Sequence, residues 1–305
     1  MLVSVVMSIY NESVDFIEKS VNSILAQTYK NFEFIIVIDN PENVGSIELL
    51  KQKQLMDSRI VLIENDRNVG LSKSLNKAIK QSKGQYIFRM DADDISVADR
   101  IERQLAFMND HNLDMSSCLI KKIDQNEDII YVQKSYKSDL NRTQLAKLSK
   151  YRCIMSHPTW CVKREVYLAL DFYRDLVPVE DYDFILRALE KNYNLGILND
   201  YLLYYRDNIS GISNTQVRKQ RLMSTILKKN YGRLNEIQED IIKEMYLKEE
   251  SHNYTDFDYY EQFRNKLLCK EISIKALLKI ILNIQYLKLF IDDLRFILLK
   301  KYYKI

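Results

Sequence analysis

Three carboxylates lie within four positions, at Asp91, Asp93 and Asp94, directly after the apolar stretch 86–90. Carboxylates this close repel one another, and a bound cation would relieve the repulsion. Their hard oxygen atoms suit Mg²⁺ or Mn²⁺, which in such sites keeps open positions for the phosphates of a ligand. A solvated turn or a helix N-cap would also account for them, because aspartate is common at both. The elements around the cluster have to decide between these interpretations.

Strand-like and helical segments alternate over the first hundred residues. The apolar, β-rich runs are 2–10, 32–40, 59–66 and 85–94. Helical spacing of apolar residues marks 13–27 and 70–84, with Gly84 as the expected end of the second helix. Near-continuous apolar strands joined by crossover helices predict a parallel α/β sheet with helices on both faces.

Polar side chains follow each of the four strand-like runs. They are Tyr10, Asn11 and Glu12, then Asp39, then Asp66, Arg67 and Asn68, and finally the three aspartates. Ligands of open parallel sheets bind outside the carboxyl ends of the strands, so these residues are expected to share one crevice. A nucleotide diphosphate would fit there, with Tyr10 against the base and Asp39 and Asp91 as polar partners. Its phosphates would meet a metal on Asp93, helped by Arg67.

Six segments taken together resemble the inverting glycosyltransferases of family 2, of the bacterial surface-polysaccharide type. They occur in the family's order across residues 2–214, which makes them more specific than one acidic motif. They read "VSVVMSIYNE", "FEFIIVIDN", "NDRNVGLSKSLNKAI", "GQYIFRMDADD", "HPTWCVKREVY" and "VEDYDFILRAL". The resemblance implies a GT-A fold: a Rossmann-like, mixed but mostly parallel sheet with helices on both faces, here followed by a C-terminal helical extension.

The resemblance also implies roles for the residues of the nucleotide-sugar pocket. Tyr10 and Glu12 would line it, and Asp39 would face the base. Arg67 would lie near base or phosphate, in a loop shaped by Asn68 and Gly70. Asp91 would approach the nucleoside, Asp93 would bind Mn²⁺ or Mg²⁺ bridged to the diphosphate, and Asp94 would support that region or the sugar.

A second acidic motif, Glu180 and Asp181, stands at the start of an obvious helix. Taken alone it fits a helix N-terminus, where acids meet the dipole favourably. The resemblance implies that Asp181 is the catalytic base, preceded by Glu180. Adjacent acids and partial burial are expected to raise its pKa from about 4 toward a useful range. His157 and Trp160 suit either the acceptor pocket or a turn and the core, and neither is assigned a catalytic role.

The chain departs from the family pattern in two places. Asn40, Pro41 and Glu42 follow Asp39 where many relatives have Asp, Gly and Ser. Asn208 stands where relatives often carry a histidine that reaches the metal or pyrophosphate. Arg206 and Ser210 are therefore expected to contact phosphate instead, or the affinity for metal to be lower.

Charge is distributed unevenly along the 305 residues. Residues 266–305 hold nine Lys or Arg against three acids, which gives +6, and the total of +3 leaves −3 for the first 265 residues. A basic body would suggest nucleic acid, whereas this pattern favours membrane or partner contact. Four irregularly spaced cysteines argue against a zinc site or a disulfide framework. No basic leader precedes the first apolar run, which predicts a cytoplasmic protein.

We expect a catalytic domain over 1–215, with a nucleotide-sugar half at 1–99 and an acceptor half at 100–215. A helical region follows over 216–305. In its last part an apolar stripe repeats at steps of four and three, interrupted by lysines too often to span a bilayer. The stripe comprises Ile280, Ile284, Leu287, Ile291, Leu294 and Leu298. It would pack on the catalytic domain, pair with a second copy, or lie on the inner face of the cell membrane.

The sequence thus predicts a metal-dependent inverting glycosyltransferase. It would move a sugar from a nucleotide diphosphate sugar, with UDP inferred from the family, to a hydroxyl of a glycan or lipid-linked acceptor. Two alternatives stay open. A sugar nucleotidyltransferase should have a Gly- and Arg-rich phosphate loop after the first strand, which "SIYNESVDF" lacks. A non-catalytic, nucleotide-binding partner subunit would account for Asn208, although Asp91, Asp93 and Asp181 speak against it.

Overall fold

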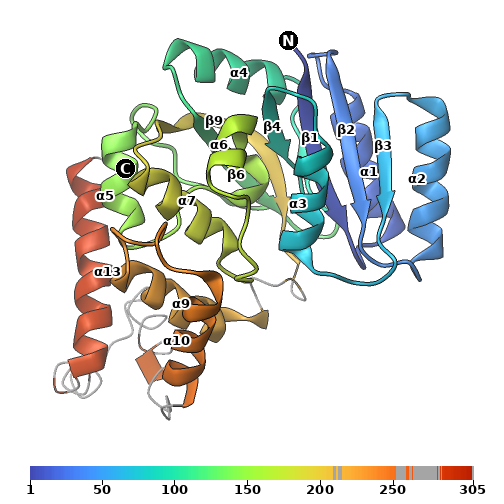
Figure 1. Ribbon diagram of the computed structural model, residues 1–305. Helices are drawn as coiled ribbons and strands as arrows, with labels where there is room; N and C mark the ends of the chain where they lie inside the picture. Colours follow the sequence, from blue (N-terminus) through green and yellow to red (C-terminus); the bar gives the residue numbers. More distant parts are fainter. Residues whose placement is uncertain are drawn as a thin grey trace.

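A computed structural model describes residues 1–208, 211, 215–251, 259–260, 263, 280, 282 and 284–303 (Figure 1). The described strands form a nine-stranded sheet in the order β3-β2-β1-β4-β8-β6-β9-β5, with β7 paired to β6. The strands are β1 Val3–Ile9, β2 Phe32–Ile38, β3 Ile60–Glu64, β4 Tyr86–Arg89, β5 Ile95–Ser96, β6 Met115–Ile123, β7 Ile129–Val132, β8 Cys161–Lys163 and β9 Leu195–Arg206.

The connecting elements are mostly helices. They are α1 Val14–Leu25, α2 Val44–Met56, α3 Leu71–Gln81, α4 Arg100–Asp110, α5 Arg142–Ser149, η1 His157–Thr159, α6 Arg164–Ala169, α7 Glu180–Glu190, α9 Val217–Lys229, α10 Glu239–Ser251 and α13 Ile284–Tyr302.

The sheet is mixed and mostly parallel, as predicted. β3, β2, β1 and β4 run parallel, β8 runs antiparallel between β4 and β6, and β9 is parallel to β6. Ile9 pairs with Ile38, and Ile38 with Glu64, so the carboxyl ends of β1, β2 and β3 are level with one another. The polar residues that follow these strands are therefore brought to one edge.

Two hydrophobic cores lie on the two faces of the sheet. Along β1, Val5 and Met7 point to one core and Val6 points to the other, the alternation expected of a strand. Helix α1 covers the first face and helix α3 covers the second, each through a stripe of buried aliphatic side chains. Helices on both faces explain why these strands are apolar nearly throughout.

Gly84 has a different role from the one predicted. Helix α3 ends at Gln81, and its cap, Ser82, has extended backbone, so Gly84 does not terminate the helix. A Cβ atom at Gly84 would lie 2.4 Å from the backbone nitrogen of Ser4. Glycine is needed here because the chain passes close against β1 as it enters β4.

The described C-terminal helices pack on the predicted catalytic domain and do not stand apart from it. Leu186 of α7 shares a third core with Met223, Ile226 and Leu227 of α9. Where a domain boundary falls, near 215 or elsewhere, stays a prediction. Most of 252–283 lies outside the described residues, as does Ser210. Among the helices that the structure describes, none is both long and apolar enough to span a membrane.

Candidate active site

The turn after β1 supplies the first part of the site. Tyr10 is 43 % exposed at the carboxyl edge, in keeping with a surface for a planar ligand group. Its backbone nitrogen donates a 2.7 Å hydrogen bond to Glu12 Oε2, which holds the turn. Burial raises the pKa of Glu12, and the charge of Asp91 adds to that effect. Glu12 is therefore already within electrostatic reach of the acidic cluster.

Asp39 organises the loop after β3. Its carboxylate accepts hydrogen bonds from Asn65 Nδ2 at 2.8 Å and from the backbone nitrogens of Val69 and Gly70 at 2.9 Å. Gly70 adopts a φ of 89°, which favours glycine, and Asn68 also accepts from its nitrogen. Asp39 is 2 % exposed. The structure thus gives it a loop-shaping role beside the expected contact with a base.

The loop that Asp39 shapes leaves its first residues open to solvent. Arg67 and Asn68 are both exposed at the carboxyl edge. An exposed guanidinium at this edge can turn toward phosphate oxygens, which it would bind through charge-assisted hydrogen bonds. Both residues are thus accessible for the ligand contacts predicted from the sequence.

The acidic cluster leaves β4 as a tight loop. Asp91 forms an ion pair with Arg89, and its carbonyl accepts a 2.8 Å hydrogen bond from Ser20 Oγ. Burial raises the pKa of Asp93 to about 7, with further contributions from Asp91 and Glu12, while a hydrogen bond from Asn208 opposes the rise. The residue that replaces the family's histidine therefore contacts the predicted metal ligand directly.

Asp94 and Arg206 form the buried support of this loop. Asp94 Oδ1 accepts a 2.8 Å hydrogen bond from the Arg206 backbone nitrogen, and Oδ2 is buried without a described hydrogen-bond partner. Burial, together with Asp91 and Asp93, raises the pKa of Asp94 well above its usual value. The loop thus keeps an acid whose charge is poorly compensated.

Arg206 is placed differently from the sequence-based expectation. Its guanidinium donates to the carbonyls of Asp93 at 2.8 Å and Asp124 at 2.9 Å, and it stacks 4.1 Å from the centre of the Phe16 ring. With 2 % of the residue exposed, it holds the acidic loop in place. A direct phosphate contact does not fit this buried geometry.

Glu180 and Asp181 begin helix α7, as predicted. Glu180 is 5 % exposed and its Oε2 is buried without a described partner. Burial raises its pKa to about 8, helped by Asp181 and, more weakly, by Asp91. Burial also raises the pKa of Asp181, although hydrogen bonds from the Tyr182 nitrogen and the Cys153 thiol oppose it. The charge of Asp91 therefore links this pair to the acidic loop.

Asp183, two residues further along α7, is compensated in full. Arg174 forms a bidentate pair with its two carboxylate oxygens, and Arg187 Nε donates to Oδ2 at 2.8 Å. All three side chains are buried or nearly so. Asp183 is a structural acid that ties the 171–174 segment to the helix.

Arg89 is the residue that sequence reasoning missed. It ends β4, is 3 % exposed, and pairs with Asp91. Burial is the main reason that several carboxyl pKa values are raised, and the Arg89 charge opposes the rise in each of them. These are Glu12, Asp94, Glu180 and Asp181. An arginine inside an otherwise apolar strand was the available signal, because a buried guanidinium requires anions around it.

The aromatic residues behind Arg89 belong to the core. Trp160 is fully buried, and its Nε1 donates to the Met155 carbonyl at 3.2 Å, so it does not offer a face to an acceptor sugar. His157 Nε2 lies 2.9 Å from the Tyr173 hydroxyl. Burial lowers the pKa of His157 well below its usual value, and the Arg89 charge adds to this. The histidine is therefore neutral and anchors the wall of the site.

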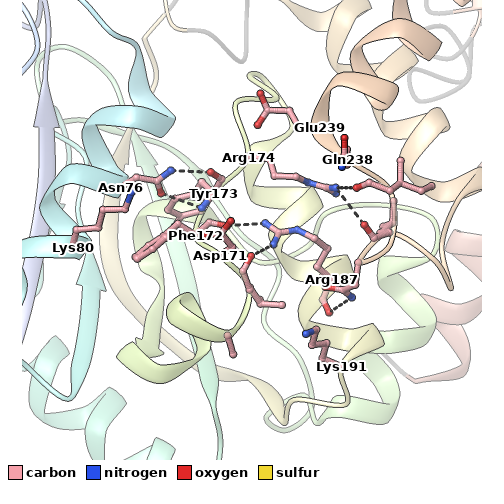
Figure 2. A pocket seen from close by; sticks show the side chains of 15 residues that line it. Asn76, Lys80, Asp171, Phe172, Tyr173, Arg174, Arg187, Lys191, Gln238 and Glu239 are labelled. Carbon is pink, nitrogen blue, oxygen red and sulfur yellow. Dashed lines mark hydrogen bonds between the residues drawn. The ribbon is translucent and has the colours of Figure 1, made fainter.

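A separate cavity of about 510 Å³ lies between α3, the 169–174 segment, α7 and the 234–239 segment (Figure 2). Asn76 and Tyr173 close one side through two hydrogen bonds, and Arg174 Nη1 donates to the Ile237 carbonyl at 2.8 Å on the other. The two arginines that line it, Arg174 and Arg187, are engaged with Asp183 and backbone carbonyls. None of the predicted site acids lines this cavity, so it is not the candidate active site.

The donor atoms of the carboxyl edge are those that Mg²⁺ or Mn²⁺ prefers. Within the described part of the chain, however, no three His, Cys, Asp or Glu side chains are arranged to hold a metal ion. Mg²⁺ is commonly held by one or two carboxylates together with substrate phosphates. The raised pKa of Asp93 and the orphaned oxygen of Asp94 fit that arrangement.

The family profile described as "Glycosyl transferase family 2" matches residues 4–170, more than half of the chain. The protein therefore belongs to glycosyl transferase family 2. An uncharacterized glycosyltransferase of Methanocaldococcus jannaschii is 36 % identical over 227 residues, 73 % of this chain and 77 % of that one. The O-antigen biosynthesis glycosyltransferase WbnJ of Escherichia coli is 31 % identical, over 72 % of this chain and 84 % of its own.

Solved structures agree on the fold. The crystal structure of S. aureus TarS 1–349 in complex with UDP-GlcNAc superposes with a TM-score of 0.62 at 17 % identity. The match covers 81 % of this chain and 70 % of that one. The fold implied by the sequence motifs is thus confirmed, and the protein is a glycosyltransferase by family.

Proposed function

We propose that the protein transfers a sugar from a nucleotide diphosphate sugar, with UDP as the nucleotide, to a hydroxyl of a glycan or lipid-linked acceptor, inverting the anomeric centre. The observation that carries the proposal is the convergence of two groups of poorly compensated acids on Arg89. Five carboxyl groups that interact with one guanidinium leave a site that favours a cation together with an anionic ligand.

The donor would occupy the carboxyl edge of β1–β4. Tyr10 offers its exposed ring to the base, and the loop held by Asp39 presents Arg67 to the phosphates. Asp93, with Asp91 beside it, would hold Mn²⁺ or Mg²⁺. When bound, the ion supplies Lewis-acid stabilisation of the departing diphosphate. Arg89 holds Asp91 in place through their ion pair.

Asp181 serves as the catalytic base. It takes the proton of the acceptor hydroxyl as the new bond forms from that oxygen to the anomeric carbon, and the bond from that carbon to the diphosphate oxygen breaks. A single displacement of this kind inverts the anomeric centre. A raised pKa suits Asp181 to this work, and burial is the main cause of the rise.

The biological setting is proposed from the relatives. WbnJ is named for O-antigen biosynthesis, and a Bacillus subtilis relative that is 37 % identical over 107 residues is named for teichuronic acid biosynthesis. The TarS structure holds UDP-GlcNAc. These names support a role in capsular, exopolysaccharide, lipopolysaccharide or related glycoconjugate synthesis, with the catalytic domain in the cytoplasm.

A turnover assay tests the proposal. The purified protein is incubated with single UDP-sugars, Mn²⁺ and lipid-linked saccharide acceptors, and released UDP is measured. The expected result is UDP release that requires acceptor, with a product whose anomeric configuration by NMR is opposite to that of the donor. A retained configuration would overturn the inverting mechanism. Formation of a nucleotide sugar from UTP and a sugar phosphate would instead identify a nucleotidyltransferase.

A further inference from the structure

Helix α13 packs through different faces in its two halves: Tyr286 and Phe290 contact Tyr260 and Phe263, whereas from Phe296 on the helix attaches to the body of the protein. It stands beside α5 at the edge of the molecule, coloured red in Figure 1. Phe296, Leu299 and Tyr303 pack against the core that includes Leu145 and Leu148 of α5. Asp293 pairs with Arg152 as well, so the attached face combines apolar packing with an ion pair to the catalytic domain.

The opposite face of α13 is an exposed apolar ridge. Leu294 is 41 %, Ile297 42 %, Leu298 62 % and Tyr302 76 % exposed. At 3.6 residues per turn, Leu294 and Leu298 each lie about 160° around the helix from Phe296. Leu294 and Leu298, which belong to the apolar stripe noted in the sequence, therefore do not pack on the catalytic domain. The face that packs there is the one with Phe296.

The acids of α13 lie on its attached side. Its two acids pair with the body, Asp292 with Lys228 at 3.4 Å and Asp293 with Arg152. Arg295 and Lys301 are both exposed. By the same helical spacing, Arg295 lies at one margin of the ridge beside Tyr302, and Lys301 lies within it between Ile297 and Leu294. The outward face of the described helix is consequently apolar with exposed basic side chains on it and beside it.

We propose that this ridge docks on an anionic membrane surface, with the helix lying in the plane of the interface. An interfacial helix buries an apolar strip at the headgroup boundary, while its basic side chains extend to anionic lipid headgroups and tyrosine sits among them. A second copy of the helix would bring Arg295 and Lys301 against like charges, which costs free energy. Charge complementarity thus selects lipid over self-association.

This docking extends the proposed function, because the enzyme would meet a lipid-linked acceptor at the membrane. The biological purpose of docking therefore rests on the proposed function. The binding itself does not depend on sugar transfer, so the two can fail separately. Membrane docking without turnover would leave the surface assignment standing. Turnover with soluble acceptors but without docking would leave only the proposed function.

Vesicle flotation of the full chain tests the inference. The probes are vesicles of phosphatidylcholine alone and of phosphatidylcholine with an equal part of phosphatidylglycerol. The protein should float with the anionic vesicles, less so as salt is raised, and stay below the neutral ones. Leu294→Glu with Leu298→Glu should weaken binding by at least about tenfold. Arg295→Glu with Lys301→Glu should weaken it on anionic vesicles too.

A matched control uses Leu55→Glu with Met56→Glu on α2, two apolar residues that are 88 % and 82 % exposed. These changes should leave flotation unaltered, and all variants should keep the thermal midpoint and UDP affinity of the parent. Absence of flotation with anionic vesicles, or equal flotation of the Leu294 and Leu298 double variant, would overturn the proposal. So would a dimer in light scattering that the same variant dissociates, because a second copy would then cover the ridge.

Discussion

Asp181 and Asp183 lie two residues apart in the first turn of α7, yet the protein treats them in opposite ways. Asp183 is buried and receives two arginines, Arg174 and Arg187. Asp181 is half-buried and receives only a backbone nitrogen and a thiol, with Glu180 beside it. Burial alone therefore does not mark a functional acid. Incomplete compensation of its charge does.

The same contrast separates the acidic loop from the rest of the sheet. Asp93 and Asp94 are neighbours of Asp91, and one guanidinium, that of Arg89, pairs with Asp91 and lowers the pKa of Asp94. An unpaired buried charge costs stability, so a protein keeps one only where it is used. Exchanging or removing these charges tests whether the two kinds of acid differ in this way.

The largest effect is expected for Asp181→Asn. Loss of the base should lower turnover by about a thousandfold, because general-base catalysis typically contributes factors of that order. UDP affinity and the urea midpoint should stay close to those of the parent. Asp15→Asn, at a side chain that is 66 % exposed, is the control and should keep full turnover. If Asp181→Asn also kept full turnover, another residue would have to be the base.

Asp183→Asn should act on stability instead. It leaves two buried guanidinium groups short of their anion, and breaking such an arrangement typically costs about 3–5 kcal/mol. Urea denaturation gives the free energy of unfolding. Asp175→Asn serves as the comparison, since Asp175 also contacts two cations, Lys73 and Lys243, but at the surface. That change should cost about 1 kcal/mol or less. Equal costs at the two positions would contradict the contrast.

Arg89→Met should change the pH dependence of turnover. Glu180 and Asp181 have raised pKa values because of burial, and the Arg89 charge opposes the rise. Turnover should therefore fall as pH decreases through the raised range, and this acid limb should move to higher pH by about one unit in the variant. The profile is measured below the unfolding temperature of both proteins. An unmoved limb with lower stability would mean that Arg89 is only structural.

Glu180→Gln should have the smallest effect. It should raise the free energy of unfolding, whereas Asp183→Asn should lower it. Burial raises the pKa of Glu180 to about 8, so the folded protein holds its proton up to higher pH than the unfolded chain does. The associated stability is present at low pH and is lost as pH rises from about 4 through about 8. The variant should thus gain on the order of 1 kcal/mol near pH 9 and nothing near pH 4. A loss of stability near pH 9 would contradict this account.

Much of the fold and site could be predicted because each prediction rested on a local pattern. The strands that end at Ile9, Ile38 and Glu64 are apolar runs, and parallel order brings their carboxyl ends together. Asp183, by contrast, differs from Asp181 only through Arg174 and Arg187, which approach it in three dimensions. The sequence pattern cannot distinguish two acids on one helix turn.

The packing of the C-terminal helix could not be predicted for a similar reason. Periodicity shows which residues share a face, and Leu287, Ile291, Leu294 and Leu298 do share one. It does not show that a second apolar face, with Phe296 and Leu299, is the one that packs on the protein. Arg206 was likewise expected to contact phosphate. Its burial against Phe16 depends on the way β9 passes the acidic loop, which the sequence does not show.

Calorimetric titration of UDP into the protein, with Mn²⁺ and then with the metal chelated, tests the central claim most directly. The account predicts binding with Mn²⁺, at least about tenfold weaker binding without it, and the same weakening for Asp93→Asn in the presence of metal. Asp183→Asn, studied under conditions where it is folded, should bind as the parent does. UDP affinity that ignores both the metal and Asp93 would contradict the assignment of the uncompensated acids to the donor site.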